Sequence, residues 1–207
     1  TFNVKCFKKP NLVNKIVYRF FRRSKAQRSF EYAQELTKMG VGTPKPLAYF
    51  EKPVGLTFGE SYYASEHLQC DLTFRELTDS LDFPDHENLL RAFTRFSYDL
   101  HEKGINFLDH SPGNTLIQLN DGEPKFFLVD LNRMRFETMG FRARMKNLSK
   151  LTIHESVVRT MSNEYSKCSG EDENKIFEIL WKETQDFQKR FHRKRKVKQQ
   201  LKFWKKS

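Results

Sequence analysis

Cysteine is scarce in this sequence, and the placement of the few cysteines excludes two kinds of structural cross-link. The 207 residues include only Cys6, Cys70 and Cys168, with no CxxC pair. A structural zinc site needs cysteines and histidines at short, regular spacing, and no such cluster occurs. An odd number of separated cysteines predicts free thiols in a reducing compartment rather than a disulfide framework.

Long apolar segments are also absent. No uninterrupted hydrophobic run approaches the roughly 18 residues that a membrane-spanning helix requires. The sequence therefore predicts a soluble or peripheral protein. Hydrophobic residues still make up 38% of the chain, and 20 residues are phenylalanine, which is enough for a packed core. Because the sequence starts with Thr1 and not with methionine, we expect the natural N-terminus to lie upstream.

Acidic residues are missing from both ends of the chain. Residues 1–30 contain nine Lys or Arg and residues 189–207 contain ten, with no acid in either segment. Residues 31–188 contain 18 basic and 26 acidic residues. Basic flanks on an acidic body suit an anionic membrane surface or a phosphorylated substrate at least as well as RNA. Nucleic-acid proteins usually carry basic groups over a folded face, and no aromatic–basic readout motif is present, so a nucleic-acid partner is disfavoured.

The first part of the chain is predicted to contain strands and one long helix. Alternating side chains predict a strand over residues 2–7, followed by a short helix over 11–21. Ser24 and Gln27 form a capping-box pattern for a helix that ends near Gly40. Its apolar face is expected to comprise Phe30, Ala33 and Leu36. Two further strands are predicted, near 47–51 and 61–67.

The second part is predicted to be mostly helical, with a hairpin in its middle. Residues 70–80 have helical character, and Asp82 or Asp85 can start a helix that Gly104 ends. A short strand at 105–108 precedes a polar loop. Strands over 115–119 and 126–129 flank the turn 120–122, where Asn-Asp-Gly is a strong hairpin signal. The helical stripe is expected to comprise Leu89, Phe93, Phe96 and Leu100.

Helices are expected from about residue 137 to 206, with a break at Ser169-Gly170. This order of elements predicts an α+β protein with two lobes around a cleft. We assign residues 1–68 to an N-terminal lobe and residues 69–207 to a C-terminal lobe.

The strongest functional signal is the stretch 107–117, which reads FLDHSPGNTLI. Asp109 follows a strand and Asn114 comes five residues later, while the hairpin then delivers Asp130 at the end of an apolar strand. Phosphoryl transfer needs a carboxylate near the attacking hydroxyl and oxygen ligands that hold Mg²⁺ against nucleotide phosphates. The pattern predicts Asp109 as the catalytic base, with Asn114 and Asp130 as metal ligands. Asp-x4-Asn alone often only shapes a turn, so the prediction rests on the whole ordered set.

The N-terminal part supplies candidates for nucleotide binding. Lys5 lies in the middle of the first strand, where a kinase places the lysine that contacts the α- and β-phosphates. Lys8 is the alternative. The acid that pairs with the nucleotide-binding lysine should come from the first long helix. Glu31 is preferred over Glu35 because it is nearer the middle of that helix. Each of these residues could instead be an ordinary surface charge.

Residues 66–68 close the strand that leads into the expected hinge between the lobes. The backbone of Glu66 and Leu68 is predicted to contact the edge of an adenine ring. His67 and His110 are read as structural hydrogen-bonding residues rather than acid–base catalysts. No glycine-rich phosphate loop is visible, and in a kinase it would precede Lys5.

Four segments together resemble the bacterial lipopolysaccharide kinase (Kdo/WaaP-type) family: 5–10 (KCFKKP), 28–31 (RSFE), 40–46 (GVGTPKP) and 109–114 (DHSPGN). The resemblance covers about residues 1–140. The resemblance implies a kinase-like fold and transfer of phosphate from ATP, with Mg²⁺, to an inner-core sugar of lipopolysaccharide, with Kdo as the expected acceptor. It also implies a peripheral location at the cytoplasmic face of the bacterial inner membrane.

The sequence departs from the wider kinase pattern in two places. Phe107 stands where many kinases have the histidine of the catalytic loop, and Asp130-Leu131-Asn132 replaces Asp-Phe-Gly. The missing glycine argues against an activation-loop switch but leaves the metal ligand in place.

Two other functions compete with this interpretation. One is a kinase for a protein or a small soluble metabolite, which would have less need of basic flanks. The other is a catalytically inactive pseudokinase or RNA-binding adaptor, which the retention of Asp109, Asn114 and Asp130 argues against.

The basic C-terminal segment, residues 189–207, has a possible membrane role. In a helix, Val197, Leu201 and Trp204 would form a narrow apolar stripe with basic surroundings. Such a helix can lie on an anionic membrane surface with its tryptophan at the interface. The alternative is a solvated basic tail.

Overall fold

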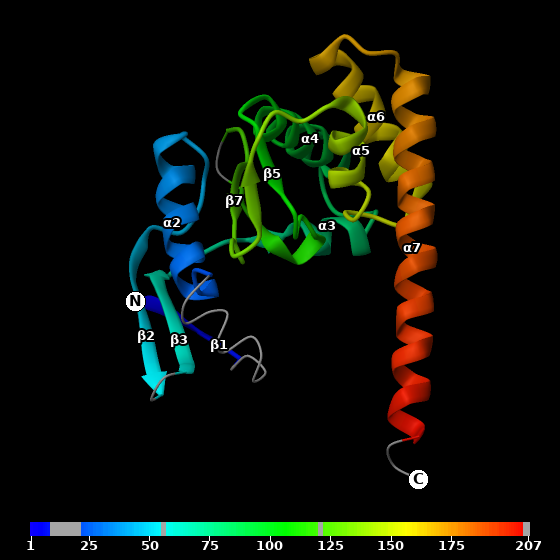
Figure 1. Cartoon of the computed structure of the whole chain (residues 1–207). Coiled ribbons are helices and arrows are strands. Elements are labelled where there is room, and N and C mark those ends of the chain that lie inside the picture. The colour runs from blue at the N-terminus through cyan, green and yellow to red at the C-terminus, as the bar shows by residue number, and fades with distance from the viewer. Residues whose placement is uncertain (9–21, 55–56, 120–121, 205–207) are drawn as a thin grey trace.

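The computed structural model describes residues 1–8, 22–54, 57–119 and 122–204. Figure 1 shows a small sheet with one helix at one end of the molecule, a central part of short strands and helices, and a long C-terminal helix along the far side. The predicted helix over 11–21 lies outside the described residues, as do Asn120 and Asp121 of the predicted hairpin turn.

The small sheet is antiparallel and contains β1 (Phe2–Phe7), β2 (Pro46–Val54) and β3 (Thr57–Glu66), in the order β1-β3-β2. Lys5 lies opposite Tyr63, so it projects from the middle of an edge strand, as predicted. Strong alternation and β-branched or aromatic residues favour these strands.

Helix α2 (Lys25–Lys38) packs on this sheet and begins where the sequence predicts. The Ser24 hydroxyl accepts a hydrogen bond from the Gln27 backbone N–H at 3.0 Å, which caps the first turn. Ala33 and Leu36 are fully buried against the core. Gly40 ends the helix with φ of +69°, a conformation that glycine adopts without steric strain.

The segment that follows α2 crosses from the small sheet to the central strands. The Leu128 N–H donates to the Gly42 carbonyl at 2.8 Å, and the Thr43 hydroxyl donates to the Leu128 carbonyl at 2.9 Å. A Cβ added at Gly42 would lie 2.2 Å from the Phe126 carbonyl oxygen, so only glycine fits this approach. The GVGTPKP stretch therefore binds the strand that leads to Asp130.

The central part holds two small antiparallel sheets. One contains β4 (Leu72–Thr73), β6 (Thr115–Gln118) and β7 (Lys125–Leu128), in the order β4-β6-β7. The other pairs β5 (Ile105–Phe107) with β8 (Met134–Phe136). The β6–β7 pairing confirms the predicted hairpin strands. The sequence prediction missed β8 because its three residues include exposed Arg135 and Phe136 and lack clear alternation.

Helices surround these strands. They are α3 (Phe74–Asp79), α4 (His86–Glu102), α5 (Phe141–Leu148) and α6 (Glu155–Ser169). The helix predicted over 70–80 is shorter than expected, because Leu72 and Thr73 pair with β6 before α3 begins. Helix α4 follows Asp85 and ends before Gly104, as predicted. Its stripe buries Leu89, Phe93 and Leu100, while Phe96 is partly buried.

Helix α7 (Glu173–Trp204) runs along the helical part and then continues beyond it (Figure 1). Ile176 and Leu180 are buried in the core, and the Glu183 carboxylate pairs with Arg142 at 3.2 Å. Residues 189–200 are exposed without exception. Within the residues that the structure describes, every helix is too short or too polar to span a bilayer. All three cysteines are free, as predicted.

Candidate active site

The loop that carries Asp109 closes on itself through hydrogen bonds. It leaves β5 after Phe107 and contains a short 3-10 turn over Pro112–Asn114. The Asn114 side chain donates from Nδ2 to the Asp109 carbonyl at 2.8 Å, and the Val129 N–H donates to the Asn114 carbonyl at 3.0 Å. Asn114 is thereby fixed between the loop and the strand that leads to Asp130.

A buried hydrogen-bond network holds the base of this loop. Asn147 on α5 donates from Nδ2 to the Phe107 carbonyl at 2.8 Å. Its Oδ1 is 2.7 Å from His110 Nδ1 and 3.3 Å from His101 Nε2. Since an amide oxygen only accepts, both of these histidine nitrogens carry the proton. His101 Nδ1 can then accept from the Tyr165 hydroxyl, 3.0 Å away.

Burial keeps both histidines neutral. It lowers the pKa of His101 from 6.5 to about 3 and that of His110 to about 4, although the bond to Asn147 opposes the decrease in each case. His110 is fully buried beside the rings of Phe93 and Phe107, which confirms it as a structural group rather than a solvent-accessible acid or base.

We expect this network to make folding stability depend on pH. Below the unfolded pKa of about 6.5, an unfolded chain binds protons at His101 and His110 that the folded chain does not bind. Stability should therefore fall as the pH decreases through 6.5 and toward 4, by about 2.5 kcal/mol per pH unit near pH 5 for the pair. Urea unfolding at a series of pH values measures this slope.

His101→Gln should reduce that slope by about half, because Gln keeps a hydrogen-bond donor but does not titrate. His192→Gln, at an exposed position on α7, is the matched control and should leave the slope unchanged. An unchanged slope in the His101 variant would contradict this account.

Asp130 has a backbone conformation that few side chains tolerate. Its φ is +60°, in the left-handed region where Asp and Asn are the best accommodated residues after glycine. Its Oδ1 accepts from Lys5 Nζ at 2.7 Å and from Asn132 Nδ2 at 2.6 Å. Lys5 and Asp130, 125 positions apart in sequence, therefore meet at one site, and Asn132 orients the carboxylate.

The arginines near Asp130 in sequence contact other acids. Arg133 pairs with the Asp109 carboxylate at 2.8 Å, and Arg135 lies 3.8 Å from Glu137. Asp130 therefore pairs with the distant Lys5 and not with an arginine that is close in sequence. Asp109 is about one third exposed, so its carboxylate remains accessible beside Arg133.

Lys150, which follows α5, lies close to Asp109. Its Nζ donates to the Leu108 carbonyl at 2.6 Å. Burial lowers the pKa of the Lys150 ammonium, while the negative charge of Asp109 counteracts part of that decrease.

A pocket of about 320 Å³ lies between the small sheet and the central strands. Lys5, Leu68, Asn114 and Asp130 all line it, so the structure brings four of the predicted site residues to one cavity. The other residues that line it are Asn3, Thr43, Pro44, Tyr63, Ser65, Leu116, Val129 and Leu131. A mainly apolar pocket with a few charged groups is typical of a small-ligand site.

Glu31 is the predicted residue that the structure places elsewhere. Its carboxylate pairs with Arg23 at 2.8 Å and accepts from the Gln27 side chain at 2.9 Å. In this structure Lys5 pairs with Asp130 and Glu31 pairs with Arg23, so the predicted ion pair between Lys5 and Glu31 is not formed, and the nucleotide role of Glu31 stays a prediction. Glu35 does not replace it, since its carboxylate pairs with Lys38. Lys8 is exposed.

The two predicted hinge residues differ in position. Leu68 lines the pocket, and within the described residues its backbone N–H has no acceptor. Glu66 donates its N–H to the Lys45 carbonyl at 2.9 Å and pairs its carboxylate with Lys45 at 3.3 Å. The nucleotide role of both residues stays a prediction.

The donor atoms near Asp130 suit a magnesium ion. The Asn114 Nδ2 group is bound to the Asp109 carbonyl, which leaves Oδ1 to act as a ligand, and Asp130 offers a carboxylate. Carboxylate and amide oxygens are ligands that Mg²⁺ prefers. In the described part of the chain no group of three His, Cys, Asp or Glu side chains could hold a metal alone, so the remaining ligands would be phosphate oxygens and water.

Sequence reasoning missed four residues that support the site. Asn132 and Arg133 follow Asp130 closely, and this closeness was the only available signal for them. Asn147 and Lys150 come from α5 and the segment after it, and no sequence pattern connects them with the loop at Asp109.

Two comparisons of sequence identify related proteins. The model of the lipopolysaccharide kinase (Kdo/WaaP) family matches residues 10–179. A protein of Pasteurella multocida (strain Pm70), 3-deoxy-D-manno-octulosonic acid kinase, is 25% identical over 164 residues. The alignment covers 77% of this chain and 65% of that protein, so the chain spans just under two thirds of its relative.

A solved structure of WaaP in complex with acyl carrier protein has a similar fold. It aligns with a TM-score of 0.56 at 18% identity, covering 79% of this chain and 76% of that one. At this identity the match concerns the fold alone, and it confirms the predicted α+β, kinase-like class.

Proposed function

Because the chain belongs to the lipopolysaccharide kinase (Kdo/WaaP) family, we propose that it transfers the γ-phosphoryl group of ATP to a sugar hydroxyl of the lipopolysaccharide inner core. We further propose Kdo (3-deoxy-D-manno-octulosonic acid) as the acceptor sugar, supported by the name of the 25% identical relative. The reaction would take place at the cytoplasmic face of the inner membrane.

The observation that carries this proposal is the meeting of Lys5 and Asp130 in the pocket that Asn114 also lines. A lysine can bind nucleotide phosphates, and an Asn–Asp pair can hold the metal that accompanies them. Asp109 begins the loop that Asn114 ends, so a base stands next to this phosphate site.

In the proposed reaction, Asp109 accepts the proton of the sugar hydroxyl while the hydroxyl oxygen forms a bond to the γ-phosphorus of ATP. The bond from that phosphorus to the β-phosphate oxygen breaks, and ADP leaves. Lys5 binds the α- and β-phosphates, and Asn114 and Asp130 would hold Mg²⁺. When bound, Mg²⁺ neutralises charge on the phosphate oxygens.

The ribose and adenine would lie against the apolar side chains that line the pocket, among them Leu68. The free N–H of Leu68 fits an acceptor nitrogen of adenine. In this proposal, residues 1–68 would form a nucleotide-binding lobe and residues 69–207 a catalytic lobe.

One assay tests the function against its competitors. The full-length protein is incubated with labelled ATP and Mg²⁺ and offered Kdo-bearing lipid A, a generic protein substrate and a soluble neutral sugar in parallel. We expect label in the lipid alone. Label in the protein or the neutral sugar would favour a different kinase, and no transfer to any acceptor would favour a pseudokinase.

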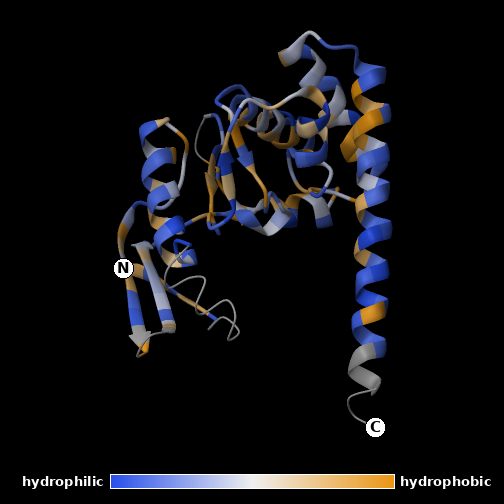
Figure 2. Ribbon diagram, in the orientation of Figure 1, coloured by the Kyte–Doolittle hydropathy of each residue, from blue (hydrophilic) through white to orange (hydrophobic). Residues whose placement is uncertain are grey.

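The exposed basic half of α7 supports a peripheral membrane location. The helix continues to Trp204, so this segment is helical in backbone as the membrane interpretation requires. Figure 2 shows its lower half as mostly hydrophilic with isolated hydrophobic positions. Arg190, Arg193, Lys194 and Lys198 surround Val197, whose side chain is 47% exposed. We propose that this face lies on anionic lipid headgroups.

A triple variant in which Arg193, Lys194 and Lys198 are all replaced by glutamine should bind anionic vesicles more weakly, on the order of 10²-fold at low salt. Each basic residue near an acidic bilayer contributes about 1 kcal/mol, and salt screens the attraction. Turnover on membrane-embedded acceptor should fall, with KM for ATP unchanged. Vesicle co-sedimentation at two salt concentrations measures the binding.

Lys182→Gln, an exposed lysine on the packed half of α7, is the control and should bind as the unmodified protein does. If the triple variant bound anionic vesicles as tightly as the unmodified protein, the proposed membrane role of this helix would be contradicted.

A further inference from the structure

A second pocket, of about 330 Å³, touches the same catalytic loop at different residues. Ser111 and Pro112 line it, whereas the nucleotide pocket touches the loop at Asn114. The two pockets share no lining residue. Asp109 starts the loop between them, so a group in the second pocket would approach the catalytic base from outside the nucleotide site.

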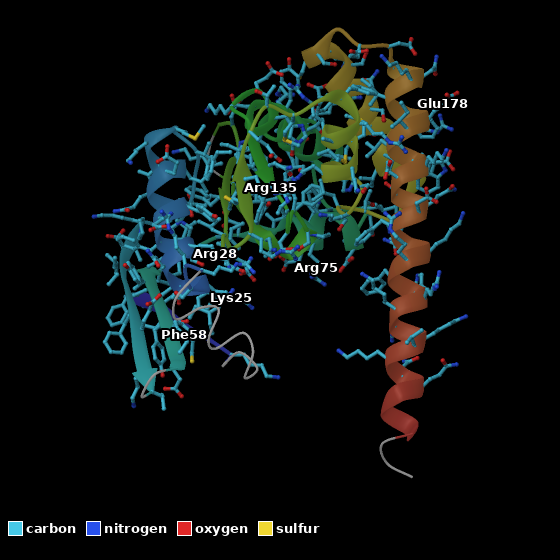
Figure 3. All side chains as sticks on the ribbon, in the orientation of Figure 1. Lys25, Arg28, Phe58, Arg75, Arg135 and Glu178 are labelled. Carbon is cyan, nitrogen blue, oxygen red and sulfur yellow. The ribbon has the colours of Figure 1, made fainter. Side chains whose placement is uncertain are left out.

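Arg75 on α3 contributes a guanidinium group that rests against the catalytic loop. A Cβ added at Gly113 would lie 3.0 Å from Arg75 Nη2 and 3.4 Å from Nε, so glycine allows this close contact. Figure 3 places Arg75 at the lower edge of the part of the chain that holds α3 and α4. With the other described residues Arg75 forms no ion pair, although the carboxylate of Asp79 lines the same pocket.

Lys150 contributes a second positive charge to the same pocket. Its ammonium donates one hydrogen bond, to the Leu108 carbonyl, and therefore has two further protons to donate. Among the described residues it forms no ion pair within 4 Å, although the charges of Asp109, Arg133 and Lys146 affect its pKa. Lys150 thus connects the second pocket with the catalytic base.

The remaining walls suit a sugar. Phe187 and Phe191 of α7 stack with ring centroids 6.3 Å apart, and the Phe191 side chain is 52% exposed. Asp79 and His154 are the other ionisable groups that line the pocket and can hydrogen-bond hydroxyl groups. An apolar wall with a few convergent polar groups is the usual composition of a small-ligand pocket.

We propose that this pocket receives the acceptor, and that Arg75 and Lys150 bind an oxyanion carried by the acceptor sugar beside the hydroxyl that faces Asp109. The oxyanion is a carboxylate or a phosphate monoester, the two groups whose geometry a guanidinium fork matches. The proposal rests on the proposed function and deepens it: the enzyme would select acidic sugars and not neutral ones.

The test measures acceptor binding and transfer separately. Isothermal titration of the full chain without ATP compares Kdo with its methyl ester, and a sugar phosphate with the same sugar lacking phosphate. We expect each acid to bind at least about tenfold more tightly than its neutral partner, since hydrogen bonds to charged groups are the stronger ones. The two pairs show whether carboxylate or phosphate is preferred.

Arg75→Gln should raise Kd and KM for the acidic acceptor about tenfold or more, with kcat and KM for ATP changed far less. Arg75→Lys should recover part of the affinity because it keeps the charge but not the bidentate fork. Lys150→Gln should also weaken acceptor binding. Arg135→Gln is the matched control, because Arg135 is exposed on β8 and lines neither pocket.

Thermal melts establish that each variant is folded before its binding is compared. Equal affinity of the unmodified protein for acids and neutral partners would overturn the proposal. Equal acceptor affinity of the Arg75 and Arg135 variants would overturn it as well. If the protein bound acidic sugars selectively but transferred phosphate to no acceptor, the proposed function would be contradicted. The oxyanion site at Arg75 and Lys150 would still be supported.

Discussion

Asp109→Asn is expected to lower kcat by about 10²-fold or more, because a positioned general base contributes about 10²–10⁴-fold to a proton-transfer step. Asparagine keeps the shape of the side chain and can still accept a hydrogen bond from Arg133, which lies 2.8 Å from the carboxylate. The fold should be unaffected, since the bonds that hold the loop use the Asp109 backbone and not its side chain.

Asp99→Asn provides the matched control for this substitution. Asp99 is exposed on α4 and pairs only with Lys103 among the described residues, in an arrangement whose loss costs little stability. Phosphate transfer to Kdo-bearing lipid A and thermal unfolding are measured for both variants. Near-normal turnover by the Asp109 variant would remove Asp109 from the catalytic role.

Asp130→Asn is expected to raise the Mg²⁺ concentration needed for activity and to lower kcat by about 10²-fold, since a metal supplies several kcal/mol of charge stabilisation. Asparagine is the informative substitution here. It tolerates the φ of +60° at this position and can still accept from Asn132, whereas alanine would add backbone strain of about 1–2 kcal/mol.

Stability should change little in this variant, because the ion pair between Lys5 and Asp130 is partly exposed on both sides and such pairs contribute about 0–1 kcal/mol. Activity is titrated against Mg²⁺ at fixed ATP, and melting is followed without nucleotide. Lys5→Met serves for comparison and should raise KM for ATP without shifting the Mg²⁺ dependence. A metal dependence equal to that of the unmodified protein, with a melting temperature many degrees lower, would assign Asp130 a purely structural role.

Local patterns predicted the elements of the fold well where residues close in sequence determine them. The Ser24 cap, the buried stripe of α4 and the strands of the β6–β7 hairpin all depend on neighbours within a few positions. Local patterns did not predict strands β4 and β8, because segments of two and three residues are too short to show a period. Both segments become strands only by pairing with distant partners.

The pair predicted between Lys5 and Glu31 shows a different limit. Periodicity places Glu31 correctly on α2, but it does not say which cation the carboxylate meets. In the folded chain Arg23 lies nearer along the same segment, and Lys5 meets Asp130 across the pocket instead.

The sequence by itself determined the chemical groups of the candidate site and their order: a carboxylate after a strand, an amide five residues later and a second carboxylate after a hairpin. Their spacing follows from local chain geometry, which the sequence encodes directly. Only the tertiary structure decided that Lys5 contacts Asp130 and that Asn147 holds the loop. It alone also brought Arg75 and Lys150 together beside Ser111. These contacts join segments tens of residues apart, and they exist because core packing brings those segments together.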